Sequence, residues 1–173
     1  EKVRALMRFS NLILIGMPGS GKSTLGTLLA KRLFLDFVDT DHLIEMSEGC
    51  SLQDIVDMKG CDELRSVEER VILDLSVNNH IIATGGSAIY SDKGMVHLKS
   101  QGLVIFLDVS RSTLESRVSN FGTRGLAKSA DQTFDQLFME RVSLYRQYSD
   151  LRIDCNHLSE EDGCSRIIEQ ISV

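Results

Sequence analysis

The chain has 173 residues, 42% of them hydrophobic and 25% charged, which predicts one globular domain with a sizeable core. Its 19 basic and 25 acidic residues give a net charge of −6, and this balance argues against a nucleic acid or an anionic membrane as a partner held by charge. No apolar run approaches the roughly 20 residues that a membrane-spanning helix needs. We therefore expect small-molecule partners, with neither nucleic acid nor membrane.

The first predicted strand, residues 11–15, is followed by a glycine-rich loop and then by a predicted helix, residues 24–33. The loop reads Gly16-Met17-Pro18-Gly19-Ser20-Gly21-Lys22-Ser23-Thr24 and matches the phosphate-binding pattern G-x-x-x-x-G-K-[ST]. In such a loop the backbone N–H groups surround phosphate oxygens, Lys22 supplies a charge for the β- and γ-phosphates, and the Ser23 hydroxyl can bind Mg²⁺. The alternative is a plain glycine-rich turn, but the strand–loop–helix context favours nucleotide binding.

Strand-like and helix-like segments alternate along the rest of the chain. The further strand candidates are residues 34–38, 80–83, 103–107 and 151–154, and the further helix candidates are residues 41–48, 52–57, 62–76, 92–100, 111–119, 131–149 and 159–171. This alternation predicts an α/β fold in which helices cover both faces of a parallel sheet. Ligands of such sheets bind at the carboxyl ends of the strands, where Asp39, Gly85 and Gly86 are expected.

Two carboxylates follow the second predicted strand, in Asp39-Thr40-Asp41. Residues two apart on an extended segment point to the same side, so both side chains could face the phosphate site. One would then hold Mg²⁺ through water, while the other would orient a substrate hydroxyl or accept its proton. The alternative is that an aspartate caps the helix at 41–48, and the two roles are compatible.

Several other features leave a choice between a ligand site and an ordinary structural role. The segment Thr84-Gly85-Gly86-Ser87 allows either a close approach of a ligand or a tight turn. Arg65 and Glu68 share one face of a predicted helix, which alone favours a solvated surface. Arg141 suits a carboxylate partner although an arginine on a helix is usually at the surface, and Arg117 could stack on an adenine.

The longest irregular stretch, residues 119–130, is small and polar and contains Arg124 and Lys128. A loop of this length in a compact domain is often functional, and its two cations could close over phosphates as a lid. The alternative is a disordered connection.

The cysteines are scattered at Cys50, Cys61, Cys155 and Cys164. Neither they nor the four histidines have the spacing of metal ligands. We expect reduced, structural thiols and a cytoplasmic protein.

These motifs, in this order, resemble those of the shikimate kinases over nearly the whole chain. The matching segments are residues 16–24 (Walker A), 39–41 (D-T-D), 60–68 (G-E-x-x-F-R-x-x-E), 84–88 (G-G-G-A), 123–126 (the R-P-L of the lid) and 141–145 (R-x-P-L-Y). The phosphate loop alone indicates only nucleotide binding, whereas the ordered set is far more specific.

The resemblance implies a three-layer α/β/α P-loop kinase fold, one domain over residues 1–173, with a five-stranded parallel sheet in the order 2-3-1-4-5 and a mobile lid at about 119–130. It implies a monomeric enzyme that transfers the γ-phosphoryl group of ATP, with Mg²⁺, to the 3-hydroxyl of shikimate. This reaction is a step of aromatic amino acid biosynthesis.

The resemblance also implies a role for each candidate residue. Catalysis would depend on Lys22, Asp41 and Arg124, with Arg124 entering from the lid. Shikimate would be bound by Asp41, Arg65, Gly85, Gly86 and Arg141, with the two arginines on its carboxylate. ATP would be bound by Gly19, Ser20, Gly21, Lys22, Ser23, Thr24, Arg117 and Arg124, and Mg²⁺ by Ser23 and Asp39.

Four positions depart from the family pattern. Ser87 replaces the third glycine of G-G-G, Leu64 replaces an aromatic residue, Gly125 replaces the lid proline and Ser143 replaces a later proline. None removes a charged group, so we expect changes of pocket shape and lid closure with activity retained. The alternatives are a related small-molecule kinase, such as a gluconate kinase, and a nucleotide-binding regulator, which would be expected to lack one of the catalytic residues.

Overall fold

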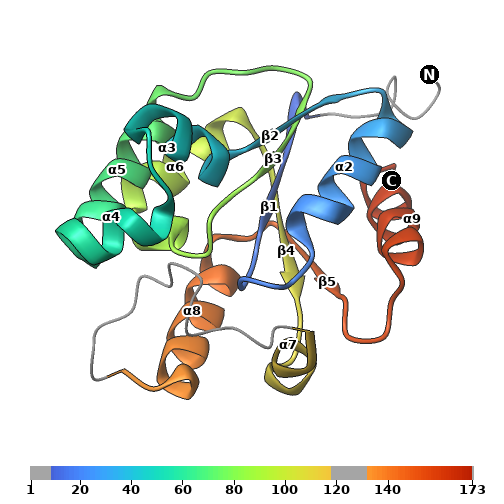
Figure 1. The fold of residues 1–173 in the computed structure, drawn as a ribbon. Coiled ribbons are helices and arrows are strands. Elements are labelled where there is room, and N and C mark those ends of the chain that lie inside the picture. Colours follow the sequence, from blue (N-terminus) through green and yellow to red (C-terminus); the bar gives the residue numbers. More distant parts are fainter. Residues whose placement is uncertain (1–8, 118–131, 173) are drawn as a thin grey trace.

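A five-stranded parallel sheet forms the centre of the molecule in the computed structural model, which describes residues 9–117 and 132–172 (Figure 1). The strands lie in the order β2-β3-β1-β4-β5, and every neighbouring pair is parallel. Their bounds are β1 (Asn11–Ile15), β2 (Asp36–Asp39), β3 (His80–Ala83), β4 (Gly102–Asp108) and β5 (Leu151–Asp154). The predicted α/β class and strand order are therefore confirmed, while the predicted lid, 119–130, lies outside the described residues.

Helices cover both faces of this sheet. Figure 1 shows α2 (Lys22–Leu33) and α9 (Glu160–Ile171) packed together on one side, and α5 (Cys61–Asp74), α6 (Asp92–Gln101) and α8 (Phe134–Tyr148) on the other. A short 3₁₀ turn, η1 (Ala88–Tyr90), follows β3, and α7 (Arg111–Arg117) follows β4. In the part of the chain that the structure describes, no helix is both long and apolar enough to cross a bilayer.

The main core surrounds β1, whose residues are all fully buried. A parallel strand that is covered on both faces is expected to read as a continuous apolar run, as this one does after its first residue. That first residue, Asn11, donates from Nδ2 to the carbonyls of Val77 and Gln101 at 2.8 and 3.1 Å, and its Oδ1 accepts from the backbone N of His80. This buried amide thus ties the amino end of β1 to the segments before β3 and β4.

A second, smaller core is formed by the chain segment that connects β2 to β3. It is formed by α3 (Thr40–Glu48), α4 (Leu52–Lys59) and α5, through the buried side chains of Ile44, Ile55, Leu64 and Val67. The chain therefore places a separately packed three-helix unit beside the carboxyl ends of β2 and β3.

Two predicted boundaries shift for identifiable reasons. The second strand begins at Asp36, later than predicted, because Phe34 ends α2 in the left-handed conformation with φ 56°. The helix predicted at 131–149 begins at Phe134, since Thr133 caps it and forms a capping box with Gln136. Both differences depend on which residue caps a helix, and the spacing of hydrophobic residues does not indicate that residue.

Candidate active site

A cavity of about 1250 Å³ opens at the carboxyl ends of the strands. It is bounded by the phosphate loop, the ends of β2 and β3, the small three-helix unit, α8 and the amino end of α9. Of the predicted site residues, those that line it are Gly19, Ser20, Gly21, Lys22, Ser23, Thr24, Asp39, Asp41, Gly85, Gly86, Arg117 and Arg141. Arg65 is not among the lining residues, and Arg124 lies outside the described part of the chain.

The phosphate loop has the backbone that its glycines allow. Gly16 has φ +151°, and a Cβ there would lie 2.9 Å from the carbonyl oxygen of Leu107. The Nζ of Lys22 donates to the carbonyls of Gly16 and Met17 at 2.7 and 2.9 Å. Burial lowers the pKa of Lys22 to about 8, and the carboxylate of Asp41 opposes that shift. The loop therefore holds an ammonium group at its centre.

Asp39 joins the loop to α3 through both of its carboxylate oxygens. Its Oδ2 accepts a 2.7 Å hydrogen bond from Ser23 Oγ, and its Oδ1 accepts from the backbone N of Asp41 at 3.0 Å. The second bond makes Asp39 the N-cap of α3, so the capping role and the cavity position coexist. The premise that both aspartates lie on one extended strand is wrong, because the helix begins at Thr40; both side chains nevertheless line the cavity.

Asp41 lies in the first turn of α3, deep in the cavity. Burial and the neighbouring carboxylate of Asp39 raise the pKa of Asp41 to about 6, while the charge of Lys22 works in the opposite direction. The carboxyl group is therefore ionised at neutral pH and still basic enough to accept a proton.

Glu68 is a functional candidate to which the sequence analysis gave no role in the site. It is only 3% exposed on α5, so the solvated-surface interpretation of this helix face is wrong at this position. Ser87 Oγ donates to Glu68 Oε2, and burial raises the pKa of Glu68 to about 7. A Cβ at Gly85 would overlap both Glu68 Oε1 and Asp41 Oδ1, so the two carboxylates meet on one side of this glycine.

The two predicted substrate arginines meet around Tyr90. Arg141 is 1% exposed, which excludes a surface role, and its Cζ lies 5.6 Å from the Tyr90 ring centroid. The Cζ of Arg65 lies 4.0 Å from the same centroid, within the range of a cation–π contact. A Cβ at Gly86 would approach Nη1 of Arg141 to 2.8 Å, so this guanidinium covers the glycine turn. The structure thus brings both arginines together, with only Arg141 reaching the cavity.

Backbone groups of the glycine turn are bound by neighbours that also escaped prediction. The N–H of Gly85 donates to Thr40 Oγ1 at 3.1 Å, and the carbonyl of Gly86 accepts from the Tyr145 hydroxyl at 2.6 Å. Tyr145 is fully buried and stacks on Phe106 with ring centroids 5.2 Å apart. The R-x-P-L-Y match contained Tyr145, but nothing in that pattern indicates which backbone group its hydroxyl meets.

The opposite end of the cavity is formed by Arg117 and the segment after β5. Arg117 Nη2 donates to the carbonyl of Cys155 at 3.2 Å, and Cys155 and Leu158 also line the cavity. This arrangement places a planar, exposed cation at the mouth, which is suited to an aromatic base.

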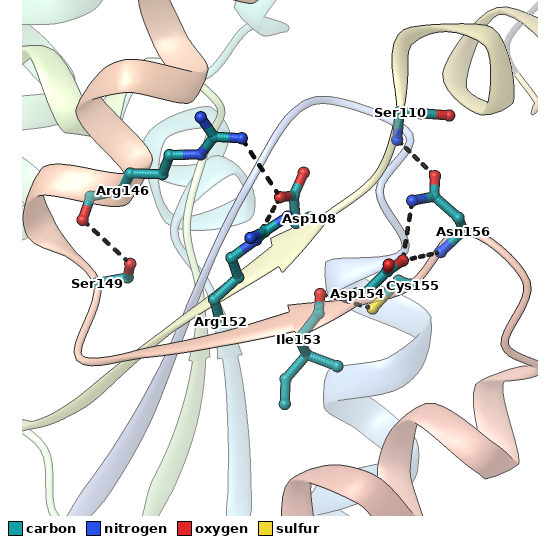
Figure 2. A network of polar contacts seen from close by, with 9 residues as sticks. All are labelled: Asp108, Ser110, Arg146, Ser149, Arg152, Ile153, Asp154, Cys155 and Asn156. Carbon is teal, nitrogen blue, oxygen red and sulfur yellow. Dashed lines mark hydrogen bonds and ion pairs between the residues drawn. The ribbon is translucent and has the colours of Figure 1, made fainter.

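A polar network fixes that segment, and Figure 2 shows it at the ends of β4 and β5. Asp108 Oδ2 accepts from Arg152 Nε at 2.6 Å and lies 4.0 Å from Arg146 Nη2 on α8. Asn156 Oδ1 accepts from the backbone N of Ser110 at 2.6 Å. The network therefore joins β4, β5 and α8 beside the cavity, and its long sequence separations kept it out of the sequence analysis.

Comparison with known proteins agrees with this geometry. The family model described as "Shikimate kinase" matches residues 18–172. A curated shikimate kinase of Sulfurihydrogenibium sp. is 37% identical over 163 residues, covering 93% of this chain and 95% of that relative. A curated shikimate kinase of Rippkaea orientalis is 38% identical over 174 residues, covering 98% of this chain and 92% of that relative.

Solved structures give the same result. The shikimate kinase from Acinetobacter baumannii in complex with shikimate superposes with a TM-score of 0.83 at 28% identity, covering 98% of this chain and 96% of that one. The shikimate kinase from Aquifex aeolicus superposes with a TM-score of 0.80 at 29% identity, covering 93% of this chain and 95% of that one. A deoxyadenosine kinase from M. mycoides, at 16% identity and a TM-score of 0.61, covers 94% of this chain and 100% of that one and shares the fold alone. The chain belongs to the shikimate kinase family.

Proposed function

We propose that this chain is an ATP-dependent kinase that phosphorylates the 3-hydroxyl of shikimate, giving shikimate 3-phosphate and ADP. The observation that carries the proposal is that the Asp41 carboxylate and the Arg141 guanidinium line the same cavity as the phosphate loop. A hydroxylated carboxylate needs one group that accepts from its hydroxyl and one fixed cation for its charge. The family membership supports the same substrate.

The acceptor is proposed to bind between the small three-helix unit and the glycine turn. Arg141 would pair with the shikimate carboxylate, because a buried guanidinium presents a planar pair of donors to an anion. Arg65, whose Cζ lies 4.0 Å from the Tyr90 ring centroid, would reinforce the positive charge at this end. The backbone of Gly85 and Gly86 would then lie against the ring of the acceptor.

The phosphate loop is proposed to bind the ATP phosphates, with Lys22 neutralising the transferred group. Phosphoryl transfer depends on positioning and charge neutralisation more than on covalent chemistry. Asp41 would orient the 3-hydroxyl or take its proton, and a pKa of about 6 permits either role at neutral pH. Arg117 would stack on the adenine, and Arg124, in the predicted lid, would add a second cation to the phosphates.

Mg²⁺ is proposed to be held by Ser23 and, through water, by Asp39. The donor set fits this ion, because a hydroxyl and a carboxylate oxygen already lie 2.7 Å apart and both are hard oxygen ligands. Among the described residues no group of three or more His, Cys, Asp or Glu side chains could hold a metal. This agrees with a kinase ion, which binds one or two protein groups together with substrate phosphates. When bound, Mg²⁺ supplies charge neutralisation at the phosphate oxygens.

The remaining proposals concern the protein as a whole. We propose a single catalytic domain acting as a cytoplasmic monomer. The cavity draws its lining from residues between Pro18 and Gly163, which supports a single domain, and none of the four cysteines forms a disulfide, which supports a reducing compartment.

The test is ADP release with ATP and Mg²⁺, measured without acceptor and with shikimate, gluconate or AMP. Stimulation by shikimate alone is the expected result. Turnover with gluconate or AMP but not with shikimate would be consistent with a kinase and would overturn the assignment of shikimate as the substrate. ATP binding without release of ADP on any acceptor would favour a regulator.

A further inference from the structure

Ser87 makes a polar contact inside the acceptor end of the cavity. It stands where the family pattern has a third glycine, it is 8% exposed, and it lines the cavity. Its hydroxyl donates to Oε2 of Glu68, a carboxylate on α5 that is itself 3% exposed. A departure from the family pattern thus supplies a hydrogen bond to one of the most deeply buried charges of the molecule.

The second oxygen of Glu68 is buried beside Gly85, at the edge of the acceptor pocket. Glu68 Oε1 has no hydrogen-bond partner among the described residues, although Glu68 lines the cavity. A Cβ at Gly85 would overlap this oxygen and Asp41 Oδ1 together, so both oxygens lie on the same side of the glycine. A buried polar atom without a partner is costly, so this oxygen calls for a group that supplies the missing bond.

We propose that Ser87 is a positioning residue of the acceptor site: by holding Oε2 of Glu68, it directs Oε1 to a hydroxyl of the acceptor other than the one that Asp41 binds for transfer. The proposal rests on the proposed function in one respect, since it takes the acceptor to be a polyol. It goes beyond that function because it gives this chain's own serine a role that a glycine cannot perform.

The surrounding charges explain why the carboxylate needs to be held. Burial and, more weakly, the charge of Asp41 on α3 raise the pKa of Glu68, whereas Arg141 on α8 and Arg65 on α5 lower it. Burial lowers the pKa of Lys22, and Glu68 is the weakest of the carboxylates that oppose this shift. The Ser87 bond also favours the ionised form of Glu68, so its removal should raise the pKa of this group above about 7. Without that bond, the two guanidinium groups would draw the carboxylate away from Gly85.

The experiment compares Ser87→Ala, Ser87→Gly and Ser87→Thr with the unchanged protein, and Ser47→Ala serves as a serine control on α3. We expect Ser87→Ala and Ser87→Gly to raise KM for shikimate roughly tenfold, since a hydrogen bond to a charged group is lost. The kcat and the KM for ATP should stay within about twofold, because Ser87 touches no reacting atom. Ser87→Thr retains the hydroxyl and should restore KM.

Two further readouts separate positioning from simple structural support. The pKa of the Glu68 carboxyl, followed by carbon-13 NMR, should rise in Ser87→Ala and return in Ser87→Thr. The unchanged protein should discriminate between shikimate and an analogue that lacks the 4- or the 5-hydroxyl, and Ser87→Ala should lose that discrimination for one of the two. In a Glu68→Gln background, Ser87→Ala should change KM no further.

An unchanged KM for shikimate together with an unchanged Glu68 pKa in Ser87→Ala would overturn the proposal. A parallel loss of kcat, both KM values and thermal stability would also overturn it, because that pattern indicates structural support alone. If the unchanged protein releases no ADP with shikimate, the proposed function fails separately. The NMR titration, which needs no acceptor, still decides whether Ser87 holds Glu68.

Discussion

The hydroxyl of Ser23 donates a 2.7 Å hydrogen bond to Oδ2 of Asp39 and so joins the first turn of α2 to the end of β2. The other carboxylate oxygen of Asp39 is occupied by the backbone N of Asp41. One aspartate therefore sets the position of the serine on the phosphate side and of the second aspartate on the acceptor side. The donor and acceptor ends of the cavity are connected through this single residue.

Ser23→Ala should weaken the use of Mg²⁺ more than the binding of shikimate. We expect kcat to fall by roughly two orders of magnitude and the Mg²⁺ concentration for half-maximal rate to rise, because a ligand of the ion is lost. The measurement is a Mg²⁺ titration of ADP release. Thr27→Ala, an exposed hydroxyl on the same helix, is the control and should behave as the unchanged protein. An unaltered Mg²⁺ requirement in Ser23→Ala would show that the ion is held elsewhere.

Asp41→Asn should lower activity and raise stability at the same time. Loss of the proton acceptor is expected to cost about two to four orders of magnitude in kcat. The folded-state pKa of about 6 lies above the ordinary value of 3.8, so burying the carboxylate is unfavourable above pH 6 and costs nothing below about 3.8.

The stability of Asp41→Asn is read from urea unfolding as a function of pH. Above pH 6 the free energy of unfolding should exceed that of the unchanged protein by about 1–3 kcal/mol, and below pH 4 the difference should vanish. Asp36→Asn, at an exposed position of β2, is the matched control. If Asp41→Asn were less stable than the unchanged protein above pH 6, burial of the ionised Asp41 carboxylate could not be a cost to folding, and the prediction would be wrong.

The pH dependence of kcat/KM should be bell-shaped, with limbs near 6 and near 8. Activity needs Asp41 ionised, so it falls below a pKa of about 6, and it needs Lys22 protonated, so it falls above a pKa of about 8. Bound phosphates would raise the pKa of Lys22, so the basic limb of kcat should lie at higher pH than that of kcat/KM. Lys22→Arg should remove the basic limb, because arginine stays charged. Persistence of that limb would exclude Lys22 as its source.

Asp108→Asn tests the network of Figure 2. Asp108 is 8% exposed, but its partners Arg146 and Arg152 are largely exposed and can return to water, so we expect a loss of only about 1 kcal/mol. Since the network fixes the segment after β5, KM for ATP should rise a few-fold while KM for shikimate changes little. The steady-state constants check this, with the exposed Asp57→Asn as control. An equal rise of both KM values would mean that the network supports the whole cavity.

Features that depend on local pattern were predictable from the sequence. The loop around Lys22 was predicted because glycine spacing and the flanking strand and helix determine its backbone, and the strand order came from the family resemblance. The burial of Glu68 was not predicted, since periodicity groups residues on one helix face without saying what covers that face. The contact between Asp108 and Arg152 spans 44 residues and is visible only once β4 and β5 are neighbours. The clamp by Arg65 and Arg141 stays a prediction.

The small core of Ile44, Ile55, Leu64 and Val67 supports the two helices that carry Asp41 and Glu68, and it is separate from the packing around β1. Substitutions inside this cluster would therefore act first on the two carboxylates and only through α5 on the sheet that holds the phosphate loop. The choice of alcohol can therefore change through the small core, while Asp39 remains the link between the acceptor end and the nucleotide end. A kinase built in this way can acquire a new acceptor while keeping its phosphate donor.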